Sequence, residues 1–244
     1  MQAVILAAGK GTRFQSDKAK VLHEISGKPL VKYVVELADS LGINEKIVVV
    51  GHQGKEVERS LDTIKGVHFA WQEQQMGTGH AVMMAKPYLD PKENDVLILY
   101  GDVPGLRKET LLKLIAEHIF QRNILTVLTA ELEGPKWYGR ILRDNLGRVL
   151  GIREAKDATA EELLIKEINS GIMVINIPFL LSALDNLSSN NDQKEYYLTD
   201  LVEIACKRRL SVGALIVADS DEIKGVNSVE ELEEMGEILG KREN

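Results

Sequence analysis

Residues 3–14, Ala-Val-Ile-Leu-Ala-Ala-Gly-Lys-Gly-Thr-Arg-Phe, decide which fold this sequence adopts. The uninterrupted apolar run at residues 3–8 is typical of a strand that is buried on both faces of a sheet. The glycines that follow, Gly9 and Gly11, can form a turn whose backbone amides close on an anion. Arg13 and Lys20 then place two positive charges near this turn. We therefore predict a strand that leads into a loop binding a phosphate-bearing ligand.

Two common glycine motifs do not fit this turn. A dinucleotide-binding fingerprint needs a third glycine where Phe14 stands, and a P-loop needs four residues between its glycines followed by Lys-Ser or Lys-Thr. Arg13 offers a planar fork of donors and Lys20 a mobile point charge, which together suit the polyphosphate of a nucleoside triphosphate. The spacing alone is equally compatible with a tight turn that carries two solvated cations.

Strand patterns and helix patterns alternate along the first 131 residues. This alternation predicts an α/β fold of Rossmann-like type, with a mostly parallel central sheet and helices on both faces. The expected strands after the first are residues 46–50, 67–71, 95–100 and 124–131, and the expected helices are residues 29–41, 56–64, a segment from about 79, and 110–121.

The pattern becomes irregular after residue 132, and we interpret residues 133–175 as an inserted lobe or lid. Short strands and polar turns are expected at residues 138–141, 149–152, 154–157 and 167–172. Regular elements are then expected at residues 171–177 (strand), 179–187 (helix), a helix ending near 208, and 211–217 (strand). This organisation predicts one domain of residues 1–228, followed by an acidic C-terminal helix within residues 229–244.

Length and composition exclude several classes of protein. The chain has 244 residues, enough for one large domain, and its formal net charge of −7 argues against a general nucleic-acid binder. Its single cysteine, Cys206, allows no intrachain disulfide, so a reducing cytoplasm is the expected compartment. The apolar runs are too short to cross a bilayer, and we expect no association with a membrane.

Polar residues follow two of the predicted strands. The amides of Gln72 and Gln75 each present a donor and an acceptor, which match the imide edge of uracil, although such loop residues are often merely solvated. Asp102 follows the strand at residues 95–100, where a carboxylate suits Mg²⁺. Taken without further context, such an aspartate is more typical of a cap for the helix beginning near residue 108.

Six motifs between residues 3 and 227 make this sequence similar to sugar-nucleotide pyrophosphorylases. The glycine turn fits their Leu-x-x-Gly-x-Gly-x-Arg pattern, and residues 72–79 and 100–104 fit Gln-x-x-Gln-x-Gly-Thr-Gly and Tyr-Gly-Asp-x-Pro. More narrowly, the chain resembles the uridylyltransferase half of bacterial bifunctional N-acetylglucosamine-1-phosphate uridylyltransferase / glucosamine-1-phosphate acetyltransferase. This resemblance implies Mg²⁺-dependent transfer of UMP from UTP to N-acetylglucosamine 1-phosphate. It also implies that the lobe at residues 133–175 binds the sugar.

The resemblance also implies roles for individual residues. Arg13 and Lys20 are the implied catalytic residues, and Asp102 and Asn227 the implied Mg²⁺ ligands, although Asn227 is also suited to cap the following helix, as is Ser228. The implied nucleotide contacts are Leu6, Ala7, Ala8, Gly9, Gly11, Gln72, Gln75, Gly77 and Thr78. The implied sugar contacts are Tyr100, Gly101, Gly139, Glu154, Asn169, Tyr197 and Thr199. The sequence departs from the usual pattern at Gln74, Gly105 and Ser170.

Two rival functions remain open at this stage. Another pyrophosphorylase is possible because thymine shares the imide edge of uracil, and a catalytically silent sugar-nucleotide sensor could use the same fold. The joint presence of both cations and both metal ligands favours catalysis. We expect structural roles for His23 and His80, since the reaction has no proton to manage.

The repeat domain of the bifunctional enzymes is not expected in this chain. They continue into a hexapeptide-repeat β-helix that carries acetyl transfer, and no such repeats occur in these 244 residues. We therefore expect no acetyl transfer and a monomer or weak oligomer. An excised domain and a natural single-domain relative both fit this observation.

Overall fold

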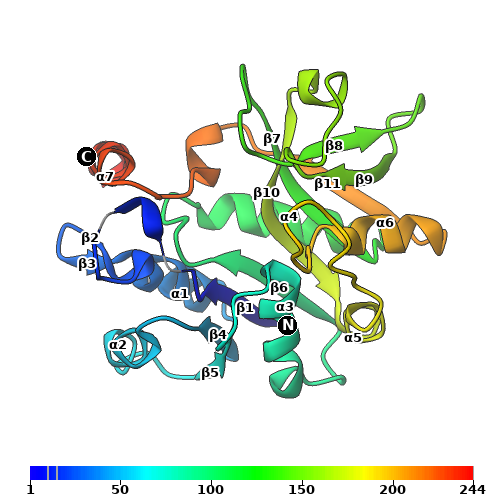
Figure 1. The fold of residues 1–244 in the computed structure, drawn as a ribbon. Coiled ribbons are helices and arrows are strands. Elements are labelled where there is room, and N and C mark those ends of the chain that lie inside the picture. The colour runs from blue at the N-terminus through cyan, green and yellow to red at the C-terminus, as the bar shows by residue number, and fades with distance from the viewer. Residues whose placement is uncertain (10, 15, 244) are drawn as a thin grey trace.

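A sheet of nine strands runs through the described part of the protein (Figure 1). The computed structural model describes residues 1–9, 11–14 and 16–243. Seven strands lie in the order β11-β7-β10-β6-β1-β4-β5, and β8 and β9 extend the sheet from β10. The strands are β1 (Gln2–Ala7), β4 (Lys46–Val50), β5 (Val67–Trp71), β6 (Asp95–Tyr100), β7 (Leu125–Glu131), β8 (Arg140–Arg143), β9 (Val149–Arg153), β10 (Glu167–Asn176) and β11 (Val212–Ile216), with a separate hairpin of β2 (Glu24–Ile25) and β3 (Lys28–Pro29).

Helices cover both faces of this sheet (Figure 1). They are α1 (Leu30–Ser40), α2 (Gly54–Ser60), α3 (Thr78–Ala85), α4 (Lys108–Phe120), α5 (Ile177–Leu184), α6 (Asp200–Lys207) and α7 (Val229–Glu243). Along β1, Ala3 and Ile5 join one core cluster with α1, α2 and α4, whereas Val4 and Leu6 join the other with α3, α5 and α6. Both faces of β1 are therefore buried, which explains its uninterrupted apolar sequence.

The sheet is mostly parallel, as predicted. Strand β1 pairs in parallel with β4 and β6, β4 with β5, and β7 with β11. In the centre of the sheet the exception is β10, which is antiparallel to both β6 and β7. At its side, β8 is also antiparallel to both β10 and β9. The predicted α/β architecture is thus confirmed, and the alternation of elements did not reveal the reversed central strand.

The single strand β10 replaces two predicted segments, residues 167–172 and 171–177. Its pairing with β7 shifts register between Asn169 and Met173, so one strand bends instead of ending. Gly171 permits this bend because its φ is +84°, and a Cβ there would lie 2.5 Å from the ring of Tyr100. The first part of β10 pairs with β8, and its second part pairs with β6.

Three helices, α2, α4 and α5, begin two residues earlier than predicted. Helix α4 occupies Lys108–Phe120 instead of residues 110–121. Helix α2 occupies Gly54–Ser60 instead of residues 56–64, because Gln53, at φ +53°, begins a helix that closes at Leu61. Helix α5 occupies Ile177–Leu184 instead of residues 179–187. The Asn176 side chain accepts from the backbone N–H of Phe179, which caps α5 at this earlier position.

The last helix, α7, packs an apolar face against the segment that follows the glycine turn. Met235 is buried there in a third cluster with Phe14, Ile25 and Leu30. Figure 1 shows α7 beside the β2–β3 hairpin, on the opposite side of the sheet centre from β8 and β9. The acidic helix of the sequence is therefore amphipathic, and it holds the N-terminal loop and residue 227 on one side of the molecule.

Within the described ranges, no helix is both long enough and apolar enough to pass through a lipid bilayer.

Candidate functional site

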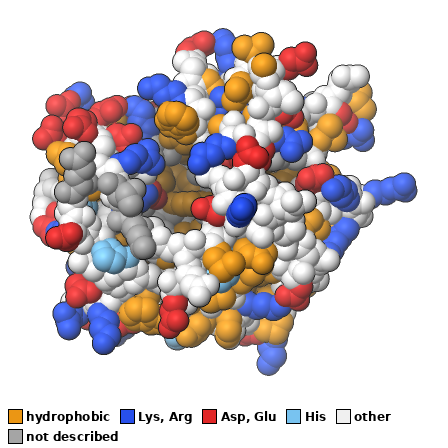
Figure 2. All heavy atoms as spheres, in the orientation of Figure 1, with side chains coloured by type: hydrophobic (Ala, Val, Ile, Leu, Met, Phe, Trp, Pro, Cys, Tyr) orange, Lys and Arg blue, Asp and Glu red, His pale blue; other side chains and the backbone are white. Residues whose placement is uncertain are grey.

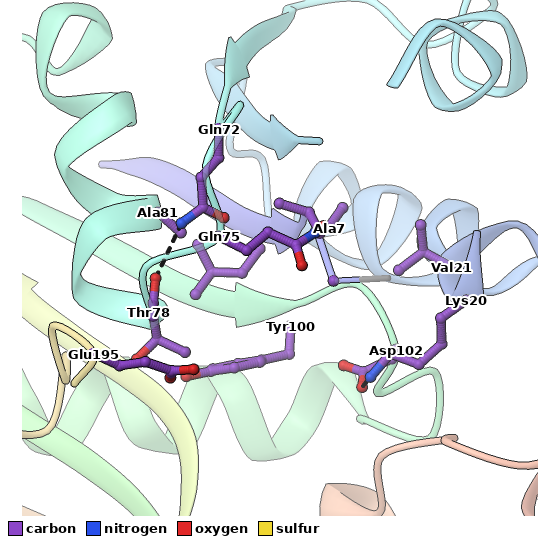
Figure 3. Close-up of a pocket in the computed structure, with 14 residues that line it drawn as sticks. Ala7, Lys20, Val21, Gln72, Gln75, Thr78, Ala81, Tyr100, Asp102 and Glu195 are labelled. Atoms are coloured by element: carbon purple, nitrogen blue, oxygen red, sulfur yellow. Dashed lines mark hydrogen bonds and ion pairs between the residues drawn. The ribbon is translucent and has the colours of Figure 1, made fainter. Parts of the chain in front are cut away.

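A cavity of about 240 Å³ lies where β1, β5 and β6 end (Figure 3). Figure 2 shows that this face of the molecule is hollowed near its centre, with hydrophobic side chains at the floor. The residues lining the cavity are Leu6, Ala7, Ala8, Gly9, Lys20, Val21, Gln72, Gln75, Gly77, Thr78, Ala81, Tyr100, Asp102 and Glu195. Eight of the nine predicted nucleotide-binding residues are among them. The fold therefore gathers these residues from two segments, 6–9 and 72–78, around one cavity.

Gly11, the ninth predicted residue, does not line this cavity. Its φ is +66°, and a Cβ at this position would lie only 2.5 Å from the Cβ of Lys20. Glycine is thus required for the loop to pass beside Lys20. Lys10, which the predicted phosphate-binding turn includes, lies outside the described residues.

Gln72 is held at the wall of the cavity by two hydrogen bonds (Figure 3). It is buried, and its Nε2 donates to the carbonyl of Gly77 at 3.1 Å. The same Nε2 also donates to Nδ1 of His80, which Figure 3 does not draw, at 3.0 Å. The Gln75 amide likewise donates to the carbonyl of Ala8. Each glutamine was expected to offer a donor and an acceptor to a base, but both N–H groups of Gln72 and one of the two N–H groups of Gln75 already bond within the protein. What the two amides have available for a ligand is chiefly their carbonyl oxygens.

The ammonium of Lys20 lies between two oxygens that belong to the predicted metal ligands. Its Nζ donates to Oδ2 of Asp102 and, at 3.0 Å, to Oδ1 of Asn227. Figure 3 shows the Lys20 side chain reaching Asp102 at the end of the cavity. Since both oxygens bind one cationic nitrogen, they converge on a single point where a cation can sit.

The donor set at this point fits Mg²⁺. The pair supplies one carboxylate and one amide oxygen, and Mg²⁺ is usually held by one or two protein oxygens together with phosphate and water. No group of three or more His, Cys, Asp or Glu side chains suited to a metal occurs among the described residues. A metal held here by Asp102 and Asn227 would therefore depend on oxygens from a ligand.

Neither the Asp102 nor the Asn227 side chain caps a helix. Helix α4 begins at Lys108 after Arg107, whose side chain makes no capping hydrogen bond, and Asp102 lies well before that point. At α7 the capping oxygen is Oγ of Ser228, which accepts from the backbone N–H of Glu231 at 3.2 Å. The capping alternatives open for Asp102 and Asn227 are thus not realised.

Asp102 and Asn227 meet although the strands before them are not neighbours. Asp102 follows β6 and Asn227 follows β11, and both β10 and β7 lie between these strands. The chain after β11 returns across the sheet edge, and Val226 donates to the carbonyl of Asp102 at 2.9 Å. This backbone contact positions the next residue, Asn227, against the Asp102 carboxylate.

A second cavity, of about 370 Å³, lies on the other side of Asp102. Its lining residues are Arg13, Tyr100, Asp102, Val103, Gly134, Pro135, Lys136, Trp137, Tyr138, Ser170, Ile223, Gly225, Asn227 and Glu231. Arg13 is exposed at this cavity, whereas Lys20 lines the first. The two predicted catalytic cations therefore line different cavities, and Asp102 lines both.

The predicted sugar-binding residues of the lobe form a cluster around Glu154. Thr199 Oγ1 donates to Glu154 Oε1 at 2.9 Å, and Gly139 lies beside the same carboxylate. The backbone N–H of Asn169 donates to the carbonyl of Gly139 at 2.9 Å. Burial raises the pKa of Glu154 above its usual range, and the hydrogen bond from Thr199 opposes this rise.

Glu154 and Tyr197 line a third cavity, of about 310 Å³, instead of either of the first two. Tyr100 connects this cluster to the nucleotide cavity, because it lines the first and second cavities and feels the charges of both Glu154 and Asp102. Burial and these two carboxylates raise the pKa of the Tyr100 hydroxyl. Gly101 lines none of the three cavities; its N–H donates to the carbonyl of Leu6 at 2.9 Å.

Both histidines near the site have structural contacts, as expected. His80 orients the Gln72 amide, as described above. His23 stacks on Phe14 with 4.1 Å between ring centroids, and burial, helped by the charge of Lys18, lowers its pKa.

Several residues that line the two cavities did not emerge from the sequence. Glu195 lines the first cavity, and Lys136, Trp137 and Glu231 line the second. The Gly134-Pro135 pair is the local sequence feature that indicates a turn before Lys136. Nothing in the spacing indicates that this turn reaches the end of β6.

The chain matches a family model and many relatives. Residues 3–166 match the model of the MobA-like NTP transferase domain. The chain is 48% identical over 242 residues to the bifunctional protein GlmU of Acetivibrio thermocellus, which covers 99% of this chain and 52% of the relative. It is also 48% identical over 243 residues to GlmU of Caldanaerobacter subterraneus subsp. tengcongensis, again covering 99% and 52%. The chain thus spans about half the length of the curated relatives it matches.

Solved structures share the fold. A UDP-glucose pyrophosphorylase complexed with UDP-glucose superposes with a TM-score of 0.79 at 19% identity, covering 99% of this chain and 98% of the other. A putative glucose-1-phosphate thymidylyltransferase from Bacillus anthracis gives a TM-score of 0.75 at 16% identity, covering 98% and 94%. At these identities the likeness shows the fold alone. The family model, which matches two thirds of the chain, shows that the protein belongs to the MobA-like NTP transferase family.

Proposed function

We propose that this chain transfers UMP from UTP to N-acetylglucosamine 1-phosphate, giving UDP-N-acetylglucosamine and pyrophosphate. The observation that carries the proposal is the meeting of Lys20, Asp102 and Asn227 between the first and second cavities. The GlmU relatives are 48% identical to almost the whole chain, which supports the choice of nucleotide and sugar.

The uracil base would occupy the first cavity. The carbonyl oxygen of Gln72 or Gln75 would accept from the imide N–H, because the amide nitrogens of both residues already donate within the protein. The backbone at Ala8 and Gly9, which also lines this cavity, would lie against the phosphates. Since thymine has the same imide edge, these contacts would accept both uracil and thymine. Only the space at the thymine methyl position would separate UTP from dTTP.

The sugar would bind near Glu154, with its phosphate directed toward Asp102. The Glu154 carboxylate, the Asn169 amide and the Tyr100 hydroxyl offer hydrogen-bonding groups of both kinds to sugar hydroxyls. Asn169 is partly committed, since its Oδ1 accepts from the N–H of Gly171 at 2.9 Å. The buried position of Glu154 would make its hydrogen bonds to a sugar stronger than those of a solvated carboxylate.

The chemical step needs positioning and charge neutralisation and no general base. The attacking oxygen belongs to a phosphate monoester that is already anionic near neutral pH. Lys20 and Arg13 would neutralise charge on the α-phosphate and on the departing pyrophosphate. Mg²⁺, which Asp102 and Asn227 would hold, supplies further neutralisation and orients phosphate oxygens.

A pyrophosphate-release assay with matched pairs of nucleotide and sugar phosphate tests this assignment. We expect the highest kcat/KM for UTP with N-acetylglucosamine 1-phosphate. A higher value for dTTP or for glucose 1-phosphate would show that the substrates are wrong, and release with none of the pairs would favour a non-catalytic sensor. We also infer a cytoplasmic protein that acts on small molecules.

A further inference from the structure

The turn formed by residues 134–137 brings a lysine to the second cavity. Lys136 and Trp137 both line this cavity together with Asp102, Asn227 and Arg13. The Trp137 side chain is 79% exposed, so the turn stands at the cavity rim instead of packing into the core.

A buried arginine fixes the backbone of this turn. Arg140 is 2% exposed, and its guanidinium donates to the carbonyl of Tyr138, to that of Lys136 at 3.3 Å and to that of Leu163 at 3.4 Å. Lys136 itself adopts a left-handed φ of +39°. A non-glycine residue in this conformation persists where the surrounding structure imposes it, so the position of Lys136 is determined by its surroundings.

Two cations that line the second cavity are available to a ligand. Asp102 is bonded to Lys20, and the Glu231 carboxylate accepts from the backbone N–H of Asn227 at 2.6 Å. Among the described residues, by contrast, neither the Arg13 guanidinium nor the Lys136 ammonium has a hydrogen-bond or ion-pair partner. The Asp102 charge is thus paired with Lys20, and the Glu231 carboxylate is held by a neutral N–H, while the two cations that line the cavity are free to bind an anionic ligand.

We propose that Lys136 binds a phosphate group of the reactants in the second cavity, which Arg13 also lines. This inference rests on the proposed function, whose reactants all carry phosphate. Two sources have the required chemistry, the pyrophosphate end of the nucleotide and the phosphate of the sugar. Lys136 is a point charge on a flexible stem, which suits a phosphate that moves as the reaction proceeds.

Kinetics of three variants test this role. Lys136→Met removes the charge and keeps a similar shape and the same left-handed strain, Lys136→Arg keeps the charge, and Arg122→Met is the matched control. Arg122 also has a left-handed φ, +53°, and an exposed side chain, but it follows α4 and lines none of the three cavities. We expect Lys136→Met to raise one KM about five- to tenfold, an effect of the size of one partly solvated ion pair. Lys136→Arg should stay within about twofold of the wild type, and the loss in Lys136→Met should shrink with added salt.

The reactant whose KM rises identifies the phosphate that Lys136 binds. A raised KM for UTP, and for pyrophosphate in the reverse reaction, would assign Lys136 to the pyrophosphate end. A raised KM for N-acetylglucosamine 1-phosphate alone would assign it to the sugar phosphate. If Lys136→Met and Arg122→Met both gave wild-type KM values for all reactants, the proposal would be wrong.

A binding measurement separates this proposal from the proposed function. The chain has two tryptophans, Trp71 and Trp137, so a Trp71→Phe background leaves Trp137 as a reporter beside Lys136. Titration with inorganic pyrophosphate and with N-acetylglucosamine 1-phosphate should change Trp137 emission, and Lys136→Met should weaken the apparent affinity for one of them about five- to tenfold. This result would support the phosphate site even in a protein that transfers no UMP. Equal affinities for both ligands in the two proteins would overturn it.

Discussion

The ammonium of Lys20 occupies the point where a divalent cation would bind, and its removal should therefore change metal affinity and rate in opposite directions. Lys20 donates to Asp102 and to Asn227, and the side chains of the ion pair are only 16% and 13% exposed. A metal must displace this ammonium before it reaches both oxygens. In Lys20→Met the oxygens are free, so the nucleotide-free protein should bind a divalent cation more tightly.

The size of the effect follows from the contact that the metal has to break. Hydrogen bonds to charged groups contribute about 1.5–3 kcal/mol. Partial access of solvent reduces this to about 1–2 kcal/mol. Because about 1.4 kcal/mol corresponds to a factor of ten in an equilibrium constant, we expect roughly tenfold tighter metal binding in Lys20→Met. The rate should move the other way, with kcat lower by about a hundredfold or more, since a donor to the developing charge is lost.

Mn²⁺ can report this binding because its free form has a strong electron paramagnetic resonance signal. We would titrate nucleotide-free wild type, Lys20→Met and Lys18→Met, and record a thermal melt of each with and without Mn²⁺. Lys18 is the matched control, since its Nζ pairs with Glu24 at 3.0 Å on the exposed surface and it lines none of the three cavities. Mn²⁺ should raise the melting temperature most in Lys20→Met. Unchanged or weaker Mn²⁺ binding in a folded Lys20→Met protein would refute the shared site.

Three further predictions concern the carboxylates and Asn227. Asp102→Asn removes the single assigned protein charge on the metal and should lose more activity than Asn227→Ala, with a higher Mg²⁺ requirement in initial-rate titrations; an unchanged Mg²⁺ dependence in a folded variant would contradict the ligand assignment. Burial raises the pKa of Glu154, so the KM for the sugar phosphate should rise as pH falls through that pKa, and Glu154→Gln should flatten this dependence; a profile that Glu154→Gln leaves unaltered would remove Glu154 from the sugar site. Burial, together with Glu203 and Asp157, raises the pKa of Asp200 from 3.8 to about 6. Ionised Asp200 therefore destabilises the folded protein, and this destabilisation is absent below about pH 4 and complete above about pH 6. Asp200→Asn should therefore raise the melting temperature at pH 8 and leave it nearly unchanged at pH 4, whereas equal shifts at both pH values would show that its charge is not the cause.

The local pattern of this sequence predicts the fold class and most of the residues that line the nucleotide cavity. The apolar run that forms β1 requires burial on both faces, and the alternation of elements requires helices on both sides of a mostly parallel sheet. Loops at the carboxyl ends of parallel strands open on one edge. For this reason Gly9, Gln72 and Asp102, each placed after a predicted strand, line one cavity.

Only the tertiary structure decided how the second half of the site is assembled. The side-chain period of a strand reports which faces are buried and carries no information on its neighbours or direction, so β10 could be placed antiparallel between β6 and β7 only in the folded sheet. Asn227 reaches Asp102 across two intervening strands because the chain after β11 turns back along the sheet edge. The same long-range packing places the Gln72 amide in hydrogen bond with His80. It also brings Lys136 to the second cavity, which Asp102 and Asn227 line. These contacts join residues far apart in the chain, and their geometry depends on the whole sheet instead of on any local spacing.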